Sequence, residues 1–246
     1  MAGLFVRGVM NGIKTTRFPR NREGGPGVSP GIPVPTHTGS AAEAVTLAAV
    51  CPTGALEARG ELVGVDLARC IHCQRCASLI GPRMKWRGDY EWTRIVPQKA
   101  AFERPFRRSM NILVVDAGDC GACLNEVRQL NNPYYNMHRL GFFITPTPRN
   151  ADLLLVVGPV TEAMRHPLVA AWEAMPEPRK VAAVGACALC GSVFGPSFTC
   201  GAGVRDLLPV DAEVPGNPPP PLAILHALLV LAGRAALGSD SDGETA

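Results

Sequence analysis

Nine cysteines are the residues of this chain best suited to do chemistry, and most of them have the spacing of metal ligands. Two thiols separated by two residues can bind one metal centre, because a short loop brings both sulfurs to the same side. This spacing occurs in Cys70-x2-Cys73-x2-Cys76, Cys120-x2-Cys123 and Cys187-x2-Cys190, and the remaining two cysteines are Cys51 and Cys200. The pattern therefore predicts metal binding by thiolates.

The N-terminal segment and the overall charge narrow the class of protein. Basic residues interrupt residues 1–22, so this segment lacks the continuous apolar stretch of a signal peptide. We therefore expect an intracellular protein, in which cysteines bind metals more readily than they form disulfides. The net charge is only +3 and no long basic stretch occurs, which argues against nucleic acid as a partner.

The first group of cysteines lies among short predicted elements. Ser40-Ala-Ala-Glu43 has the form of a capping box and predicts a helix over residues 41–50, and residues 62–66 can form a strand. Residues 18–38 are rich in Pro and Gly and predict an extended loop. Residues 3–15 predict a basic amphipathic helix, which either lies on a membrane surface, docks on a partner or packs as an ordinary helix.

This part of the chain resembles the bacterial two-cluster ferredoxin, in the version found as the electron-transfer subunit of NADH:quinone oxidoreductase and of membrane-bound hydrogenases. The resemblance rests on Cys51-Pro-Thr-Gly-Ala and on the run from Cys70 to Cys76. In that family each half carries C-x2-C-x2-C-x3-C-P, and the last cysteine of one run binds the cluster of the other run. One ligand set is lost here, because its positions hold Ala41, Ala44, Leu47 and Ile80.

The other ligand set of the ferredoxin pattern is complete. It consists of Cys51, Cys70, Cys73 and Cys76. The resemblance therefore implies one retained 4Fe-4S cluster. A zinc site is the alternative, because four thiolates are also a zinc ligand set. His72 lies between two of these cysteines and is predicted to be a neighbour of the cluster that tunes its potential or faces solvent.

From Asn111 onward the pattern changes to alternating strands and helices. Predicted strands cover residues 111–116, 152–158 and 180–185, and predicted helices cover 124–131, 162–174 and 222–237. This alternation predicts the α/β class with a doubly wound parallel sheet. The last helix is too short to span a bilayer. The cysteines of this half follow the first and third strands, at the sheet edge where ligands bind.

Residues 111–233 resemble the small subunit of membrane-bound nickel-iron hydrogenases of the energy-converting type and the 20 kDa (B-type) subunit of NADH:quinone oxidoreductase. The resemblance is carried by Cys120-Gly-Ala-Cys-Leu-Asn-Glu126 and by residues 148–161, 184–188, 209–211 and 214–219. Quinone-reducing members have adjacent cysteines in the first motif. The separated pair Cys120 and Cys123 is therefore more similar to the hydrogenase branch.

The resemblance implies a second 4Fe-4S cluster, held by Cys120, Cys123, Cys187 and a fourth thiol. The position of that fourth thiol is Asn217 in this chain. An amide oxygen is a poor ligand for an iron–sulfur cluster, which prefers soft sulfur ligands. Either another ligand substitutes for the thiol, or the cluster has a labile or missing iron, as in a 3Fe-4S form.

Two further cysteines are candidates for the missing ligand, namely Cys190 and Cys200. Each could also be a small buried apolar residue. A structural zinc site that includes Cys190 is the competing interpretation of this half. Glu126 matches an acid that the family associates with proton-coupled transfer, and it also fits a first-turn acid that favours a helix N-terminus.

We expect residues 1–85 to form a ferredoxin-like unit, residues 86–109 a linker, residues 110–238 a hydrogenase-small-subunit-like iron–sulfur domain and residues 239–246 a disordered tail. The predicted function is an electron relay between a catalytic large subunit near Cys120 and Cys187 and the first cluster. The chain has no nickel ligand set and no nucleotide-binding loop, so bond-breaking chemistry would belong to that partner. Its complex would include membrane subunits, on the cytoplasmic inner face of the cell membrane.

Two other functions are compatible with the same residues. One is a degenerate structural or scaffold subunit of such a complex, with zinc or no metal in the second site. The other is a quinone-reducing B-type subunit, which the spacing of Cys120 and Cys123 disfavours.

Overall fold

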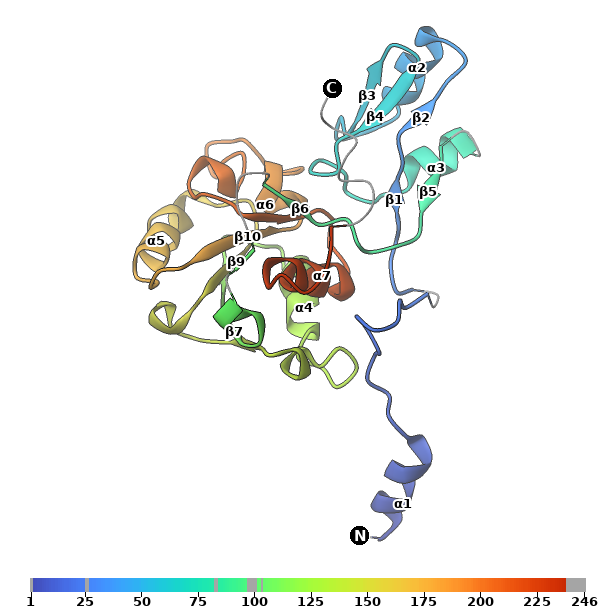
Figure 1. The fold of residues 1–246 in the computed structure, drawn as a ribbon. Coiled ribbons are helices and arrows are strands. Elements are labelled where there is room, and N and C mark those ends of the chain that lie inside the picture. Colours follow the sequence, from blue (N-terminus) through green and yellow to red (C-terminus); the bar gives the residue numbers. More distant parts are fainter. Residues whose placement is uncertain (1, 25–26, 82–83, 97–100, 103, 238–246) are drawn as a thin grey trace.

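The structure is a computed structural model that describes residues 2–24, 27–81, 84–96, 101–102 and 104–237. The predicted tail at 239–246 and five residues of the predicted linker, 97–100 and 103, lie outside these described ranges. Figure 1 shows a larger α/β part, a smaller part beside it and an N-terminal helix that stands apart from both.

The larger part is built on a six-stranded sheet in the order β6-β11-β10-β9-β7-β8. Its strands are β6 (Arg94–Ile95), β7 (Met110–Asp116), β8 (Phe142–Ile144), β9 (Leu153–Val157), β10 (Lys180–Val184) and β11 (Ala212–Val214). All neighbours are parallel except β6, which pairs antiparallel with β11. The five parallel strands have the flavodoxin-like order, which confirms the predicted doubly wound fold.

The central strand β9 explains why the sheet has a core on both faces. All five of its residues are buried. Leu153, Leu155 and Val157 belong to one hydrophobic core, whereas Leu154 and Val156 belong to the other. Because successive side chains of a strand point to opposite faces, an aliphatic run of this kind requires helices on both sides of the sheet.

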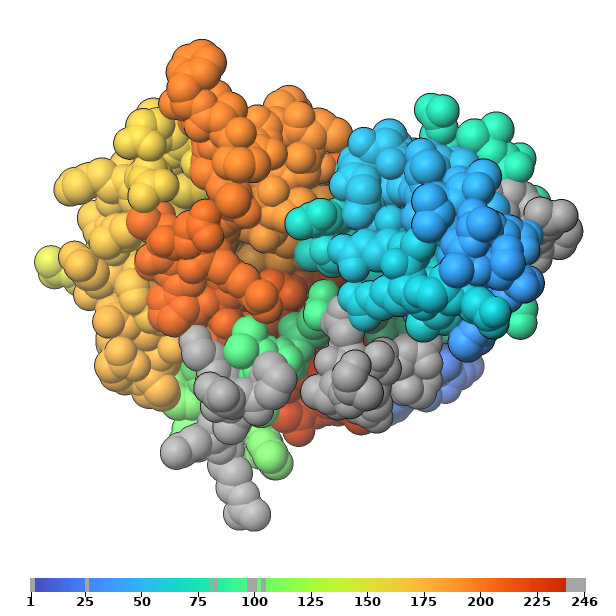
Figure 2. Space-filling model, turned by 90° about the horizontal axis from the view of Figure 1, so that it is seen from above, coloured from blue at the N-terminus to red at the C-terminus, as the bar shows by residue number. Residues whose placement is uncertain are grey.

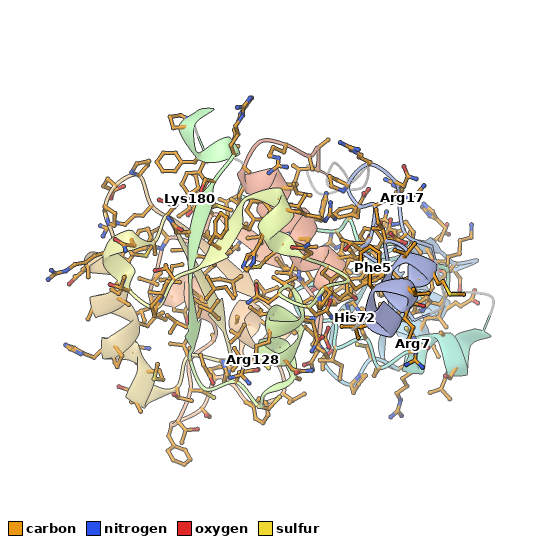
Figure 3. The ribbon with its side chains drawn as sticks, turned by 90° about the horizontal axis from the view of Figure 1, so that it is seen from below. Phe5, Arg7, Arg17, His72, Arg128 and Lys180 are labelled. Atoms are coloured by element: carbon orange, nitrogen blue, oxygen red, sulfur yellow. The ribbon has the colours of Figure 1, made fainter. Side chains whose placement is uncertain are left out.

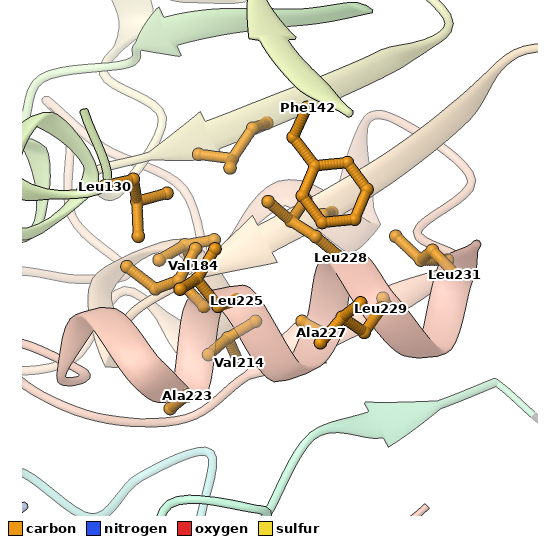
Figure 4. Close-up of a cluster of buried hydrophobic side chains, with 14 of the residues drawn as sticks. Leu130, Phe142, Val184, Val214, Ala223, Leu225, Ala227, Leu228, Leu229 and Leu231 are labelled. Atoms are coloured by element: carbon orange, nitrogen blue, oxygen red, sulfur yellow. The ribbon is translucent and has the colours of Figure 1, made fainter. Parts of the chain in front are cut away.

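Four helices cover the two faces. They are α4 (Ala122–Gln129) and α7 (Pro221–Leu231) on one face, and α5 (Glu162–Glu173) and α6 (Ala186–Cys190) on the other. In α7 every residue is buried, and Figure 4 shows Leu225 and Leu228 packed near Val184 and Val214 of the sheet. The helix ends at Leu231, earlier than predicted. No helix in the described ranges is long and apolar enough to cross a bilayer.

The smaller part, which we call the N-terminal unit, comprises the elements from β1 to β5. These are β1 (Ile32–Pro33), β2 (Thr36–His37), α2 (Ala41–Ala48), β3 (Leu56–Arg59), β4 (Leu62–Val65), α3 (Arg75–Ile80) and β5 (Trp86–Arg87). Strands β2, β4 and β3 form an antiparallel sheet, on which Ala44 and Leu47 of α2 are buried. The Ser40 hydroxyl accepts from the Glu43 amide at 3.2 Å, so the predicted cap forms.

The remaining elements connect these parts. The predicted linker supplies β5, which pairs with β1, and β6, which extends the large sheet. Helix α1 (Ala2–Asn11) ends at Gly12, whose φ of 63° is in the left-handed region that glycine favours. Short 3-10 helices occur at Arg104–Arg107, Met137–Leu140, Pro148–Asn150 and Val204–Asp206. From above, the N-terminal unit and the C-terminal part of the chain lie against one another (Figure 2).

Candidate metal centres

The four cysteines of the ferredoxin-like pattern line one pocket, which we call site 1. Cys51 follows α2, Cys70 and Cys73 lie in the loop before α3, and Cys76 is in the first turn of α3. His72 and Gln74 have φ values of 52° and 56°, so the loop curls at the residues between its cysteines. The pocket encloses about 340 Å³, including its open mouth. Residues distant in sequence therefore bring four thiols to one space.

Backbone and hydroxyl donors surround the Cys51 sulfur. The amide of Ala55 donates to Cys51 Sγ at 3.2 Å, and Thr53 Oγ1 lies 3.6 Å from the same sulfur. Burial raises the pKa of Cys51, but these hydrogen bonds outweigh it and leave the pKa below its usual value. Donors of this kind stabilise a thiolate, which is the form that binds a metal.

The other thiols of site 1 resist ionisation without a bound cation. Burial raises the pKa of Cys70 to about 12, and the nearby thiols of Cys76, Cys51 and Cys73 add to this effect. Burial also raises the pKa of Cys76. A positively charged iron core would remove this cost, so metal binding here would be coupled to thiol ionisation.

A buried indole donor of Trp86 faces the sulfur of Cys76 in site 1. This Nε1 lowers the pKa of the Cys76 thiol against the larger effect of burial, and it has no other acceptor among the described residues. Cluster sulfurs are hydrogen-bond acceptors, and such bonds help to set cluster potentials. The four thiols and this donor fit the 4Fe-4S cluster that the ferredoxin resemblance implies.

The second site is organised by two aspartates in the loop after β7. Asp116 Oδ1 accepts from the amides of Gly118 and Asp119, at 2.9 and 2.7 Å. Asp119 Oδ2 accepts from the amides of Gly121 and Leu124, at 3.0 and 2.9 Å. These bonds hold the turn that presents Cys120 and begins α4.

Cys123 and Cys187 lie at the carboxyl end of the sheet, as the spacing of strands and cysteines predicts. Both are buried, whereas Cys120 is exposed. Burial raises the pKa of Cys123, and the carboxylate of Asp119 and the thiols of Cys187 and Cys120 raise it further. These three cysteines, which we call site 2, are therefore close enough to interact electrostatically.

Glycine is required where site 2 meets β10. A Cβ on Gly185 would lie 2.4 Å from Cys123 Sγ, and the φ of Gly185 is +91°. Its neighbour Ala186 donates from its amide to the carbonyl of Gly216 at 2.7 Å. The loop that contains Asn217 is thereby tied to the start of α6, beside Cys187.

The two other cysteines of this half make different contacts. Cys190 Sγ lies 3.3 Å from the carbonyl oxygens of both Ala68 and Ala186, where its thiol faces the N-terminal unit. Cys200 Sγ donates to the carbonyl of Phe194 at 3.2 Å and lies 3.3 Å from Ser197 Oγ. Both thiols thus have partners within the protein.

An open cavity of about 690 Å³, including its mouth, borders the loops next to the two sites. Its lining includes His72 from the loop of site 1 and Glu126 and Asn217 from the part of the chain around site 2. Burial raises the pKa of Glu126 and lowers the pKa of His72 to about 4. Both ring nitrogens of His72 are buried, with no hydrogen-bond partner among the described residues. His72 therefore borders the cavity as a neutral ring.

Trp92 connects the same two loops by direct contacts. Its ring packs edge-on against His72, with centroids 5.5 Å apart. Its Nε1 donates to the carbonyl of Pro215 at 2.8 Å. A chain of contacts thus runs from the loop of site 1 through Trp92 to the loop that carries Asn217.

Asp119, Trp86 and Trp92 are site residues that the spacing of cysteines does not reveal. Asp119 has a signal in the sequence, because an Asp shortly before a helix often accepts backbone hydrogen bonds at the helix start. The two tryptophans have none, since their roles depend on contacts with distant residues. In the described part of the chain, no group of three or more His, Cys, Asp or Glu side chains forms a ready site for a single metal ion.

The parallel sheet and the cysteine loops at its carboxyl end define a flavodoxin-like α/β protein with candidate metal sites. Comparisons with known proteins give its family. Residues 120–231 match the family described as "NADH ubiquinone oxidoreductase, 20 Kd subunit". The chain is 40% identical over 123 residues to the probable membrane-bound hydrogenase subunit mbhJ of Pyrococcus furiosus, and the match covers 50% of this chain and 74% of that protein. The chain belongs to this family, and the family implies iron–sulfur binding.

Two further relatives show the range of the family. The chain is 35% identical over 139 residues to formate hydrogenlyase subunit 7 of Escherichia coli, and the match covers 56% of this chain and 54% of that protein. It is 39% identical over 110 residues to the B-type NADH-quinone oxidoreductase subunit of Carboxydothermus hydrogenoformans, and this match covers 44% of this chain and 66% of that protein. The chain thus spans about half of the first relative, and the family match begins after site 1.

Proposed function

We propose that this protein is the iron–sulfur electron-transfer subunit of a membrane-associated hydrogenase-like or NADH:quinone-oxidoreductase-like complex. Site 1 would hold a 4Fe-4S cluster on Cys51, Cys70, Cys73 and Cys76. Site 2 would hold a second cluster on Cys120, Cys123 and Cys187. When bound, such clusters supply one-electron transfer without bond breaking.

One observation carries this proposal, namely that a single cavity is lined by residues of the loops that neighbour both sites. His72 is adjacent in sequence to Cys73, and Asn217 lies in the loop tied to the start of α6 beside Cys187. Trp92 contacts both loops and holds them together. An arrangement that joins two metal sites within one chain suits a relay better than two independent structural metals.

The residues around each site have distinct tasks in this function. At site 1, Ala55, Thr53 and Trp86 offer donors to sulfur, which stabilise negative charge and raise a cluster potential. At site 2, the carboxylate of Asp119 lies near the thiols and has the opposite effect. We therefore expect site 1 to have the higher potential.

A catalytic partner is expected at the surface near site 2. The loop after α6 exposes three apolar side chains, Val193, Phe194 and Phe198, and Phe198 is 97% exposed. Aromatic side chains that are exposed in this way are typical of protein interfaces. A large subunit docked there would be close to Cys120 and Cys187, and its own residues would carry out the bond-breaking chemistry. Membrane subunits of the same complex would then hold this chain at the membrane.

The fourth ligand of site 2 is part of the proposal. Cys190 and Cys200 already have partners, which supports a cluster with three cysteine ligands over one completed by either thiol. Such a cluster would be a 3Fe-4S form, or a 4Fe-4S form with a labile iron bound weakly near Asn217.

The test is to measure iron and acid-labile sulfide per chain, with low-temperature EPR before and after dithionite, on anaerobically purified protein. We expect about seven or eight irons and two reducible signals. Cys70→Ser should remove about four irons and one signal, and Cys123→Ser should remove the other signal. Cys190→Ser is the matched control, because a serine hydroxyl can keep the contacts of Cys190 with the two carbonyls.

Two results would contradict the proposal. About four irons, with zinc or nothing in site 2, would make the C-terminal domain a structural unit instead of a relay partner. Zinc in both sites would exclude an electron-transfer role altogether. Loss of iron in Cys190→Ser would leave the electron-transfer role intact. It would show that Cys190 is a ligand of site 2.

A further inference from the structure

The N-terminal helix α1 exposes an apolar surface that nothing else in the described structure covers. Phe5 is 75% exposed, Val9 is 68% exposed and Met10 is 80% exposed. Figure 1 shows α1 standing away from the rest of the molecule, and Figure 3 shows it with Phe5 and Arg7 in the foreground of the view from below. Burying these side chains would be favourable, so the helix has the form of a binding element.

Four exposed apolar residues of α1 lie on one side of the helix. Phe5, Val6, Val9 and Met10 are at positions i, i+1, i+4 and i+5, which fall on one face of an α-helix. Arg7 projects outside this face. We call these four residues the apolar arc. Leu4 is 83% exposed but lies about 140° from Val9 around the helix axis, outside the arc.

The charge of this segment has a single sign. Residues 1–22 contain five basic residues, and the first acidic residue is Glu23. The basic residues are Arg7, Lys14, Arg17, Arg20 and Arg22. An apolar arc flanked only by positive charge is complementary to a surface that is negatively charged outside and apolar inside.

The segment after α1 attaches the helix to the body of the protein. The Thr16 amide donates to the carbonyl of Tyr134 at 2.8 Å, and Thr15 Oγ1 donates to the carbonyl of Pro133 at 2.9 Å. Phe18 is buried and packs edge-on against Tyr90, with centroids 5.3 Å apart. Residues 15–18 therefore fix the point at which α1 leaves the α/β part. A surface bound by α1 would lie close to that point.

We propose that α1 lies on the surface of a bilayer that contains acidic phospholipids, with its apolar arc in the acyl boundary and with Arg7 and the basic segment that follows the helix at the headgroups. A helix of ten residues is far too short to cross the bilayer, so it binds parallel to the surface. The proposal does not rest on the electron-transfer role, because it concerns neither cysteine site.

The test is flotation of the intact protein with lipid vesicles, without detergent. One set of vesicles contains phosphatidylcholine alone, and the other contains about 30 mol% phosphatidylglycerol. We expect the protein to float with the acidic vesicles, and high salt to weaken this binding. The double variant Val9→Gln/Met10→Gln should bind at least about tenfold more weakly, because it removes half of the arc.

Leu4→Gln is the matched control, since it changes an equally exposed apolar residue of the same helix that lies outside the arc. It should reduce binding by less than about twofold. Because α1 stands apart from the core, all variants should keep the thermal unfolding of the wild type, which verifies folding. Iron content, measured on the same samples, should be unchanged, so failure of this proposal and failure of the iron–sulfur proposal can be distinguished.

Two outcomes would overturn the proposal. One is binding to neither kind of vesicle, which would make the arc a site for a membrane subunit. The other is equal binding of the wild type and the double variant to acidic vesicles, which would assign the interaction to charge elsewhere on the molecule.

Discussion

His72 and Asn217 line the same cavity, although one comes from the cysteine loop of the N-terminal unit and the other from the loop after β11. His72 is the residue before Cys73, and the loop of Asn217 is tied to the start of α6 by the Ala186–Gly216 hydrogen bond. A change at Asn217 therefore alters a cavity that the loops next to both candidate metal sites border.

The first prediction concerns this position. We expect Asn217→Cys to add a fourth thiolate to site 2, because a thiolate is a much better ligand for cluster iron than an amide. A labile or missing iron would then be retained. Iron per chain after treatment with a chelator should rise by about one, and any EPR signal of a 3Fe-4S form should disappear.

Asn217→Ala is the companion variant. It removes the amide without adding a ligand, so an unchanged iron content would show that Asn217 itself binds no iron. If Asn217→Cys left both the iron content and the EPR spectrum as in the wild type, the assignment of this loop to site 2 would be wrong.

A second prediction follows from the charge beside site 2. Asp119→Asn retains a side-chain oxygen for the amides of Gly121 and Leu124 but removes the negative charge near Cys123 and Cys187. The reduction potential of site 2 should become more positive by some tens of millivolts, roughly the size of one nearby charge in a protein interior. Redox titration followed by EPR measures this shift.

Asp116→Asn is the control for Asp119→Asn. Its carboxylate also accepts two backbone amides, from Gly118 and Asp119, but it is not among the charges that raise the pKa of Cys123 or Cys187. Its effect on the potential should be much smaller. Equal shifts in the two variants would point to a change in loop structure instead of a direct charge effect.

A third prediction uses the contact between Gly185 and Cys123. In Gly185→Ala the new methyl group would meet Cys123 Sγ at 2.4 Å, at a φ that alanine rarely adopts. We expect a loss of about 1–3 kcal/mol in the free energy of unfolding and a loss of iron from site 2. Gly88→Ala is the matched control, because a Cβ at Gly88 meets nothing within 4 Å. Retention of full site 2 iron in Gly185→Ala would argue against Cys123 as a ligand.

The parts of the fold that can be predicted from sequence are those whose pattern is local. Strands β7, β9 and β10 are runs of aliphatic residues followed by glycine or aspartate, and the helices between them are periodic. Strand β11 is not predictable in this way, because it is only three residues long and contains Glu213. That carboxylate is buried and is paired with Arg205 at 2.6 Å, a partner that the local pattern does not reveal.

The same distinction applies to the candidate sites. The spacing of Cys70, Cys73 and Cys76 shows which thiols can share a metal, since the loop between them is short. Spacing does not show that Cys190 faces Ala68 of the N-terminal unit, or that Trp92 joins the two loops. These contacts depend on how the two parts pack, and packing is a property of the whole fold.

The last prediction concerns stability and pH, and it rests on His226 in the buried helix α7. Nε2 of this ring lies 3.0 Å from the carbonyl of Ala236, which can only accept, so Nε2 carries the proton. Nδ1 then accepts from the hydroxyl of Thr93 at 3.1 Å. Burial lowers the pKa of His226, because the charged ring is poorly solvated in the core.

Because folding lowers the pKa of His226, protonation of this ring favours the unfolded chain. The unfolded chain, with a histidine pKa of about 6.5, binds a proton more readily than the folded protein does. The stabilising effect of the neutral ring is therefore fully present above about pH 7 and is lost as the pH falls through the unfolded pKa toward the lower folded pKa. We expect the free energy of unfolding, measured with denaturant at about pH 7.5 and at about pH 5.5, to fall with pH.

His226→Gln should reduce this fall, because glutamine cannot be protonated in this range but can still donate to the carbonyl of Ala236. The variant will be less stable than the wild type near neutral pH, so the informative quantity is the difference between the two pH values within each protein. His166→Gln, at an exposed position of α5, should keep the pH dependence of the free energy of unfolding of the wild type. If the free energy of unfolding fell with pH equally in His226→Gln, His166→Gln and the wild type, proton binding at His226 would not be linked to folding.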